Sequence, residues 1–200
     1  MEYVIKDVSE ISQKDYESSF LYMSDNRKAK VERQKNRLSK QCTLAGEWLV
    51  RTLLCKLTGD PMESFVIDAD SKGKLYCKNA DGLKFNISHS QSTVAVVVSQ
   101  KEVGIDIETI RPLNLKLAQK ICTHEELEYV FEHTPSDEDF EQSTNIDYVR
   151  RFLEIWTLKE AYLKCEGTGI TGFDAFILPD KNFEKTKISN SKYVMHIVTK

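Results

Sequence analysis

Residues 147–167 read DYVRRFLEIWTLKEAYLKCEG, and this stretch decides the predicted fold. Its apolar residues recur at helical spacing, and Gly167 follows the last of them, so the pattern predicts a long amphipathic helix. In the first half of the chain, residues 40–57 give the best helix prediction, and a Gly-Asp-Pro sequence at residues 59–61 ends it. The chain therefore has two long helices, one in each half.

The two helices match each other at a constant offset of 108 positions. The matched pairs are Trp48 and Trp156, Arg51 and Lys159, Lys56 and Lys164, Gly59 and Gly167 and, just beyond the helices, Phe65 and Phe173. Any two amphipathic helices share apolar spacing, but matched tryptophan, basic and glycine positions are more than helicity requires. The pattern indicates an internal duplication.

Short runs that are typical of strands surround both helices. They lie at residues 1–8, 65–68, 75–77, 83–87, 93–99, 103–108, 173–178 and 193–198. Further helices are predicted at residues 24–40, 115–122 and 123–133, and the acidic stretch 134–145 reads as a loop. The order of strands, helix and strands thus occurs twice along the chain.

We therefore predict an α+β fold in which an antiparallel sheet packed on a long helix occurs twice, as a pseudo-twofold duplication. The expected halves are residues 1–103 and 104–200, joined in one continuous unit. We place the active site in the cleft between them, because ligands prefer such interfaces.

The composition excludes several classes of protein. The 28 basic and 31 acidic residues leave a net charge of −3 and a pI near 5.9, which argues against a nucleic-acid partner. The five cysteines are odd in number and contain no C-x-x-C pair, so neither a disulfide framework nor a zinc site is predicted. No leader and no apolar run of about 20 residues is present, so we expect a cytoplasmic protein with no membrane partner.

Residues 104–108, GIDIE, place two carboxylates on one face of a predicted strand. The period of two sends Asp106 and Glu108 to one side and the two isoleucines to the other. Neighbouring carboxylates are best tolerated when a cation joins them or when one stays protonated. Taken alone, however, this alternation favours a half-exposed strand with solvated acids.

A second motif, WTLKEAYLK at residues 156–164, places Glu160 and Lys164 on one face of the long helix. Alone it favours a core tryptophan beside an exposed Glu–Lys pair. Combined with the strand, however, it gives three carboxylates, Asp106, Glu108 and Glu160, which suit a magnesium ion that takes its remaining ligands from a diphosphate. No cysteine or histidine cluster competes for a softer metal.

Two further features fit an anionic ligand. Residues 85–90, FNISHS, run from a strand into a polar turn whose hydroxyls, imidazole and backbone N–H groups are suited to phosphate, although a plain loop has the same composition. A basic run comprises Arg27, Lys28, Lys30, Arg33, Lys35, Arg37 and Lys40. An anionic ligand or acidic partner and a solvated helix face explain this run equally well.

In order and spacing, FNISHS, GIDIE and WTLKEA, followed by Lys164 and a Gly-Thr-Gly sequence, resemble the three signatures of the Sfp-type 4′-phosphopantetheinyl transferases. The resemblance extends more faintly over residues 24–176. It implies a pseudo-twofold α+β fold, coenzyme A as donor substrate, Mg²⁺ as cofactor with Mn²⁺ as an alternative, and an apo acyl or peptidyl carrier protein as partner. With an internal duplication, a monomer suffices.

The resemblance also implies roles for individual residues. Asp106, Glu108 and Glu160 correspond to the metal ligands, and Asp106, Glu160 and Lys164 to the catalytic group, with Glu160 as a base for the acceptor serine. The phosphate contacts correspond to Ser88, His89, Lys159 and Lys164. The positions that hold the adenosine 3′-phosphate and the nucleotide correspond to Arg27, Lys30, Thr43, Gly73 and Lys74.

Three departures from the family pattern stand out. Leu75 follows Gly73-Lys74 where proline is usual, and Arg27 stands where lysine is common, which changes the hydrogen-bond geometry. The chain ends at Lys200, so we expect the second half to lack a closing strand.

The predicted function is magnesium-dependent transfer of 4′-phosphopantetheine from coenzyme A to a serine of a carrier protein. A magnesium-dependent phosphodiesterase or nuclease is one alternative, because it uses similar acidic strands and Lys-Glu helices. A non-catalytic module that binds carrier proteins is the other.

Overall fold

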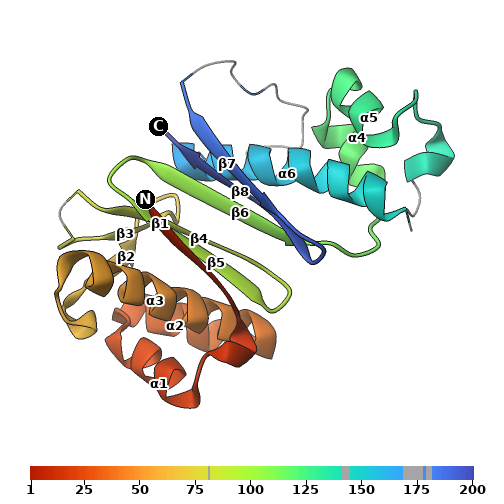
Figure 1. Cartoon of the computed structure of the whole chain (residues 1–200). Helices are drawn as coiled ribbons and strands as arrows, with labels where there is room; N and C mark the ends of the chain where they lie inside the picture. The colour runs from red at the N-terminus through yellow and green to blue at the C-terminus, as the bar shows by residue number, and fades with distance from the viewer. Residues whose placement is uncertain (81, 141–144, 169–177, 179–181) are drawn as a thin grey trace.

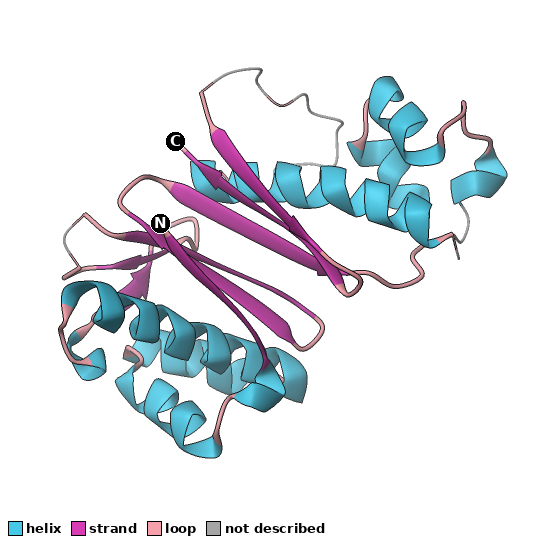
Figure 2. Cartoon of the chain, viewed as in Figure 1, coloured by secondary structure: helices cyan, strands magenta, loops and turns pink. Residues whose placement is uncertain are grey.

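The structure is a computed structural model that describes residues 1–80, 82–140, 145–168, 178 and 182–200 (Figures 1 and 2). Its α-helices are α1 (Gln13–Tyr22), α2 (Asp25–Arg33), α3 (Arg37–Thr58), α4 (Ala118–Ile121), α5 (His124–Phe131) and α6 (Ile146–Glu166). Its strands are β1 (Glu2–Asp7), β2 (Ile67–Ala69), β3 (Leu75–Cys77), β4 (Lys84–Ser90), β5 (Thr93–Ser99), β6 (Val103–Thr109), β7 (Glu184–Ser189) and β8 (Tyr193–Thr199). Short 3₁₀ helices are η1 (Val8–Glu10), η2 (Met62–Ser64), η3 (Leu115–Leu117) and η4 (Asp137–Phe140).

The first half is built on an antiparallel sheet in the order β1-β5-β4, with α3 along one face (Figure 1). Strand β5 is apolar on both sides, so the alternation divides its residues between two cores. Val94, Val96 and Val98 pack with α3, whereas Ala95 and Val97 pack on the opposite face. Both faces of this sheet are therefore covered.

In the second half, β6, β8 and β7 form an antiparallel sheet in the order β6-β8-β7, and helix α6 packs against it. Helices α4 and α5 lie beside the N-terminal part of α6 (Figure 1). At the other end, Gly104 of β6 lies against α6, and a Cβ there would overlap the Ala161 carbonyl oxygen and the Cys165 backbone nitrogen. Only glycine allows β6 to approach α6 this closely.

The two sheets pack on each other through a central apolar core. From the first sheet this core takes Ala95 and Val97, and from the second it takes Ile105, Ile107 and Ile197. The layers thus follow the order α3, first sheet, second sheet and α6. Strand β4 lies beside β6 where the halves meet, which brings residues 85–90 next to residues 104–108.

Most of the predicted elements are present. The strands at residues 75–77 and 93–99 match β3 and β5, and the capping box of α5 forms as predicted between Thr123 and Glu126. The helix predicted at residues 24–40 is instead two helices, because Asn36 caps α3 by accepting a hydrogen bond from the backbone N–H of Ser39.

Helix α1 and strand β7 were not predicted. Strand β7 is mostly exposed and carries only one aliphatic residue, so its sequence lacks the usual alternation. The strand predicted at residues 173–178 falls outside the described residues apart from Leu178. Within the part of the chain that the structure describes, no helix combines the length and apolar character needed to span a membrane.

Candidate active site

Strand β6 directs its two carboxylates toward α6. Ile105 and Ile107 face the central core, so the intervening Asp106 and the following Glu108 face the helix, as the alternation predicted. Asp106 is only 5% exposed. The interpretation of a half-exposed strand with solvated acids is therefore wrong for Asp106, because α6 covers this face.

Helix α6 brings Glu160 and Lys164 to these carboxylates, since residues four apart share a helical face. The Lys164 ammonium lies 2.6 Å from Asp106 Oδ1 and 3.0 Å from Ser88 Oγ, and the Ser88 hydroxyl donates to the same carboxylate oxygen at 2.8 Å. We call the five residues Ser88, Asp106, Glu108, Glu160 and Lys164 the junction cluster. It joins residues from both halves of the chain.

Side chains of β4 connect this strand to the backbone of β6. Asn86 Oδ1, Ser88 Oγ and Ser90 Oγ accept hydrogen bonds from the backbone N–H groups of Ile105, Ile107 and Thr109, at 3.0, 3.3 and 3.0 Å. The Ser90 hydroxyl also donates to Glu108 Oε2 at 2.7 Å. We call these contacts the β4–β6 seam. They hold residues 85–90 beside residues 104–108, with the two strands parallel.

Two oxygens of the junction cluster are buried without a hydrogen-bond partner among the described residues: Asp106 Oδ2 and Glu160 Oε1. Burial raises the pKa of Asp106, although the Lys164 ammonium opposes the shift. Burial, followed by the charge of Asp106, raises the pKa of Glu160 to about 7. Burial also raises the pKa of Glu108. Crowded carboxylates of this kind are stabilised when a cation joins them.

The fit of this site to a metal is partial. Among the described residues, no group of three or more histidine, cysteine, aspartate or glutamate side chains is arranged to hold a metal ion. The Lys164 ammonium and the Ser90 hydroxyl already bind oxygens of Asp106 and Glu108. The partnerless oxygens of Asp106 and Glu160, however, are the hard ligands that magnesium takes. The metal site with three carboxylate ligands remains a prediction.

A cavity of about 390 Å³ opens beside the junction cluster. All five residues predicted to hold the nucleotide end of the donor line it, together with two predicted phosphate contacts: Arg27, Lys30, Thr43, Gly73, Lys74, His89 and Lys164. Desolvation, followed by the charge of Lys164, lowers the pKa of His89. The cavity is thus rich in cations and hydrogen-bond donors, which suits an anionic ligand.

Some of the lining residues already have partners. The Lys74 ammonium donates to the Cys165 carbonyl at 2.8 Å and to Glu102 at 3.0 Å, so it links the first half to the C-terminal turn of α6. The Thr43 hydroxyl accepts from Gln34 and donates to the Ser39 carbonyl, both at 3.0 Å. Lys30 is exposed.

Lys159 lies in the protein interior and not in the lining of the cavity. It is 2% exposed, and its ammonium donates to the Ile121 carbonyl at 2.8 Å and to Glu126 at 2.6 Å. The structure therefore does not place it as a phosphate contact. Arg51, which lies 108 positions earlier in the sequence, is used in the same way. It is also a buried cation on a long helix, and it donates hydrogen bonds to backbone carbonyls.

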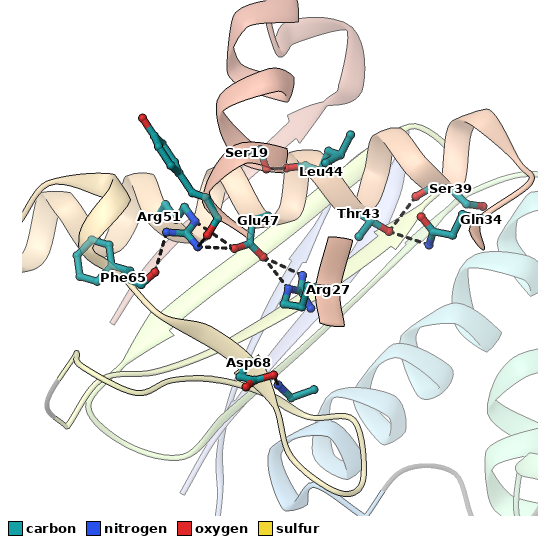
Figure 3. Close-up of polar contacts among 12 residues, drawn as sticks. Ser19, Arg27, Gln34, Ser39, Thr43, Leu44, Glu47, Arg51, Phe65 and Asp68 are labelled. Carbon is teal, nitrogen blue, oxygen red and sulfur yellow. Dashed lines mark hydrogen bonds and ion pairs between the residues drawn. The ribbon is translucent and has the colours of Figure 1, made fainter. Parts of the chain in front are cut away.

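Arg51, Glu47 and Arg27 form what we call the arginine cluster (Figure 3). Glu47 lies between the two guanidinium groups: its Oε1 accepts from Arg51 Nε and Nη2 at 3.0 and 2.9 Å, and its Oε2 accepts from Arg27 Nε at 2.9 Å. Glu47 and Arg51 are fully buried.

The sequence-based predictions missed Asn86, Ser90 and Glu47 as contributors to the site. The polar alternation Asn86, Ser88, Ser90 opposite an acidic alternation was a usable signal for the β4–β6 seam. For Glu47 the signal was weak: a glutamate on the apolar face of a helix, four residues before an arginine.

Comparisons with known proteins agree with this arrangement. A sequence model described as the 4′-phosphopantetheinyl transferase superfamily matches residues 102–197. A second one, described as 4′-phosphopantetheinyl transferase, N-terminal, matches residues 10–102, so the two together account for nearly the whole chain. The chain belongs to the 4′-phosphopantetheinyl transferase superfamily.

Curated members of this superfamily resemble the chain over most of its length. It is 28% identical to the 4′-phosphopantetheinyl transferase psf-1 of Bacillus pumilus, over 78% of the chain and 63% of that protein. It is 33% identical to gsp of Aneurinibacillus migulanus, over 73% and 56%, and 27% identical to Sfp of Bacillus subtilis (strain 168), over 80% and 67%. The matched region thus spans about three fifths of the length of these relatives.

Proposed function

We propose that the protein transfers 4′-phosphopantetheine from coenzyme A to a serine hydroxyl of an apo acyl or peptidyl carrier protein. The observation that carries this proposal is a pair of buried oxygens, one of Asp106 and one of Glu160, that have no hydrogen-bond partner among the described residues and lie beside a cationic cavity lined from both halves. A diphosphate bound there would have cations along its length and carboxylates at one end. The superfamily membership supports the same activity.

The fold proposal completes this picture. We infer that the two halves, residues 1–103 and 104–200, are a pseudo-twofold duplication with the active site in the cleft between them. The strand orders β1-β5-β4 and β6-β8-β7 correspond, and each sheet packs against one long helix. The two sequence models also meet at residue 102. Such a duplication would let one chain work as a monomer. We place this monomer in the cytoplasm.

In the proposed reaction, the serine oxygen of the carrier attacks the β-phosphorus of coenzyme A. A new P–O bond forms to the serine, and the bond to the leaving adenosine 3′,5′-bisphosphate breaks. Glu160 accepts the serine proton, and Lys164 offsets the negative charge that grows on the leaving group. Arg27, Lys30, Thr43, Gly73 and Lys74 would hold the nucleotide, while Ser88 and His89 contact the phosphates.

A divalent ion fits this site as a proposed cofactor. Asp106 and Glu160, with Glu108 beside them, would hold Mg²⁺, or Mn²⁺ as the alternative, and the ion would supply charge neutralisation on the diphosphate. When no ion is bound, Lys164 holds the Asp106 carboxylate in place through the contact at 2.6 Å.

The test is to incubate the protein with Mg²⁺, coenzyme A and either an apo acyl carrier protein or an apo peptidyl carrier protein, and to weigh the carrier by mass spectrometry. We expect a mass increase of one phosphopantetheine group, and no increase when EDTA is present from the start of the incubation. Release of nucleotides from DNA or RNA without transfer would favour the phosphodiesterase. Binding of carrier without any mass change would favour the non-catalytic module.

A further inference from the structure

The arginine cluster lies deep in the first half, yet one of its members lines the donor cavity. Arg51 uses five hydrogen bonds: two to Glu47, and one each to the carbonyls of Met62, Phe65 and Tyr22, at 2.7 to 3.0 Å. A guanidinium has five N–H donors, so Arg51 has no donor left for a ligand. Its role is therefore confined to the protein interior.

Arg27 differs in this respect. Its Nε donates to Glu47 Oε2 at 2.9 Å, and its Nη2 lies 2.8 Å from the same oxygen. Over the described parts of the chain, no residue accepts a hydrogen bond from Nη1 of Arg27. Asp68 is paired with Lys78 at 3.0 Å (Figure 3), and this contact, with a smaller contribution from the charge of Arg27, lowers the pKa of its carboxyl. One edge of the Arg27 guanidinium is thus fixed, and the other remains available in a cavity that Arg27 lines.

The net charge of the arginine cluster also indicates that Arg27 can bind an anion. Two arginines and one glutamate leave one positive charge, and the hydrogen bonds of Arg51 are already complete within the interior. The uncompensated charge therefore belongs to the cavity side of Arg27. A lysine could supply a charge at this position, but it could not bind Glu47 along one edge and present a second edge at a fixed angle.

We propose that Glu47 and Arg51 are positioning residues for the donor nucleotide: they hold the Arg27 guanidinium so that its free edge meets a phosphate group in the cavity. Arg51 anchors Glu47 to three backbone carbonyls from the end of α1 and from residues 62–65. Glu47 then fixes Arg27, which is the only member that touches the ligand. This inference rests on the proposed function, because it takes the ligand to be the nucleotide end of coenzyme A.

The experiment measures binding rather than transfer. Adenosine 3′,5′-bisphosphate is titrated by calorimetry, without carrier or metal, into wild type, Arg27→Ala, Glu47→Asp and the double variant, each checked by circular dichroism. We expect Arg27→Ala to weaken binding about tenfold or more, as loss of a charge-assisted bidentate contact does. Glu47→Asp, which keeps the charge but shortens the side chain, should weaken binding several-fold.

The double variant decides whether Glu47 acts through Arg27. If it does, the double variant binds no more weakly than Arg27→Ala, because the two effects share one path. In steady-state assays, the variants that bind the nucleotide more weakly should show a higher KM for coenzyme A at an unchanged kcat. Additive losses in the double variant, or wild-type affinity in Glu47→Asp, would overturn the inference.

Glu126→Gln is the matched control, because it removes the acid that pairs with the buried Lys159 in the other half. It should lower the melting temperature without weakening nucleotide binding. If Glu47→Asp does not fold, Arg27→Lys takes its place, and wild-type affinity in that variant would equally refute the proposal. A protein that binds no nucleotide at all would instead refute the proposed function, which the carrier assay judges independently.

Discussion

The arginine cluster and the junction cluster are both buried and both charged, but they differ in how completely they are paired. Every carboxylate oxygen of Glu47 has a guanidinium partner. In the junction cluster, oxygens of Asp106 and Glu160 are buried without a partner among the described residues. A fully paired cluster contributes to one fixed structure, whereas an incompletely paired one is costly to bury and is best explained by a ligand.

This comparison predicts that substitutions in the junction cluster cost activity rather than stability. Asp106→Asn should lower phosphopantetheine transfer on the order of 1,000-fold, because it would remove an anionic ligand of the proposed divalent ion. Unfolding free energy should change little, since burial already disfavours the charged form of Asp106. Mass spectrometry of the carrier and denaturant unfolding measure the two effects. A large loss of stability with normal transfer would reverse the roles of the two clusters.

The arginine cluster should show the opposite behaviour. Glu47→Gln leaves two buried guanidinium groups without their anion, so we expect unfolding free energy to fall by about 3–5 kcal/mol, as for other broken buried ion pairs. Lys56→Gln is the control, because it breaks the exposed pair with Glu2 at 2.9 Å on the same helix. That control should leave denaturant unfolding unchanged. Equal effects of the two variants would mean that burial of the cluster does not matter.

A third prediction concerns a buried group that stays neutral. His196 of β8 bonds to the Thr157 hydroxyl at 2.8 Å, and burial, followed by the charge of Lys187, lowers its pKa from 6.5 to about 4, against the opposing charge of Glu154. Between pH 6.5 and about 4, His196 is protonated in the unfolded chain but stays neutral in the folded protein.

The stability contributed by neutral His196 is therefore complete above pH 6.5 and is lost progressively as the pH falls toward 4, by up to about 3 kcal/mol. His196→Asn should lack this part of the pH dependence. The measurement is denaturant unfolding of both proteins across that range, and parallel curves would contradict the prediction.

The last prediction concerns the backbone contact that brings the junction cluster together. Gly104→Ala would force β6 away from the backbone of α6, at a cost of about 1–3 kcal/mol for overpacking. Asp106 would move away from Glu160 and Lys164. We therefore expect a large loss in the rate of phosphopantetheine transfer and only this modest loss in unfolding free energy. Gly46→Ala is a useful comparison, because its Cβ would meet side-chain atoms of Ile87 instead of backbone. Similar losses of transfer in both variants would argue against this explanation.

Much of the junction cluster could be predicted from the sequence because its pattern is local. The alternation at residues 104–108 determined which face Asp106 and Glu108 occupy, and the spacing of four placed Glu160 above Lys164. What covers that face could not be read, so the burial of Asp106 was missed.

The partners of buried cations were also hidden from the sequence. Lys159 binds Ile121 and Glu126, more than thirty residues away in the chain, and no local pattern reports such a contact. The carbonyl partners of Arg51 lie closer in the chain, but they belong to other elements and loops, so helix periodicity did not predict them either. Helix periodicity shows that a residue lies on an inner face, but it does not show whether a cation there meets a ligand or the protein itself.

The β4–β6 seam has a consequence for how such a molecule can vary. Because side chains of Asn86, Ser88 and Ser90 make the connection, exchanging any of them alters the spacing between the two layers while both hydrogen-bonded sheets stay whole. The gap between the cationic cavity and the acidic residues is therefore adjustable by point mutation, without any need to redesign the architecture on either side.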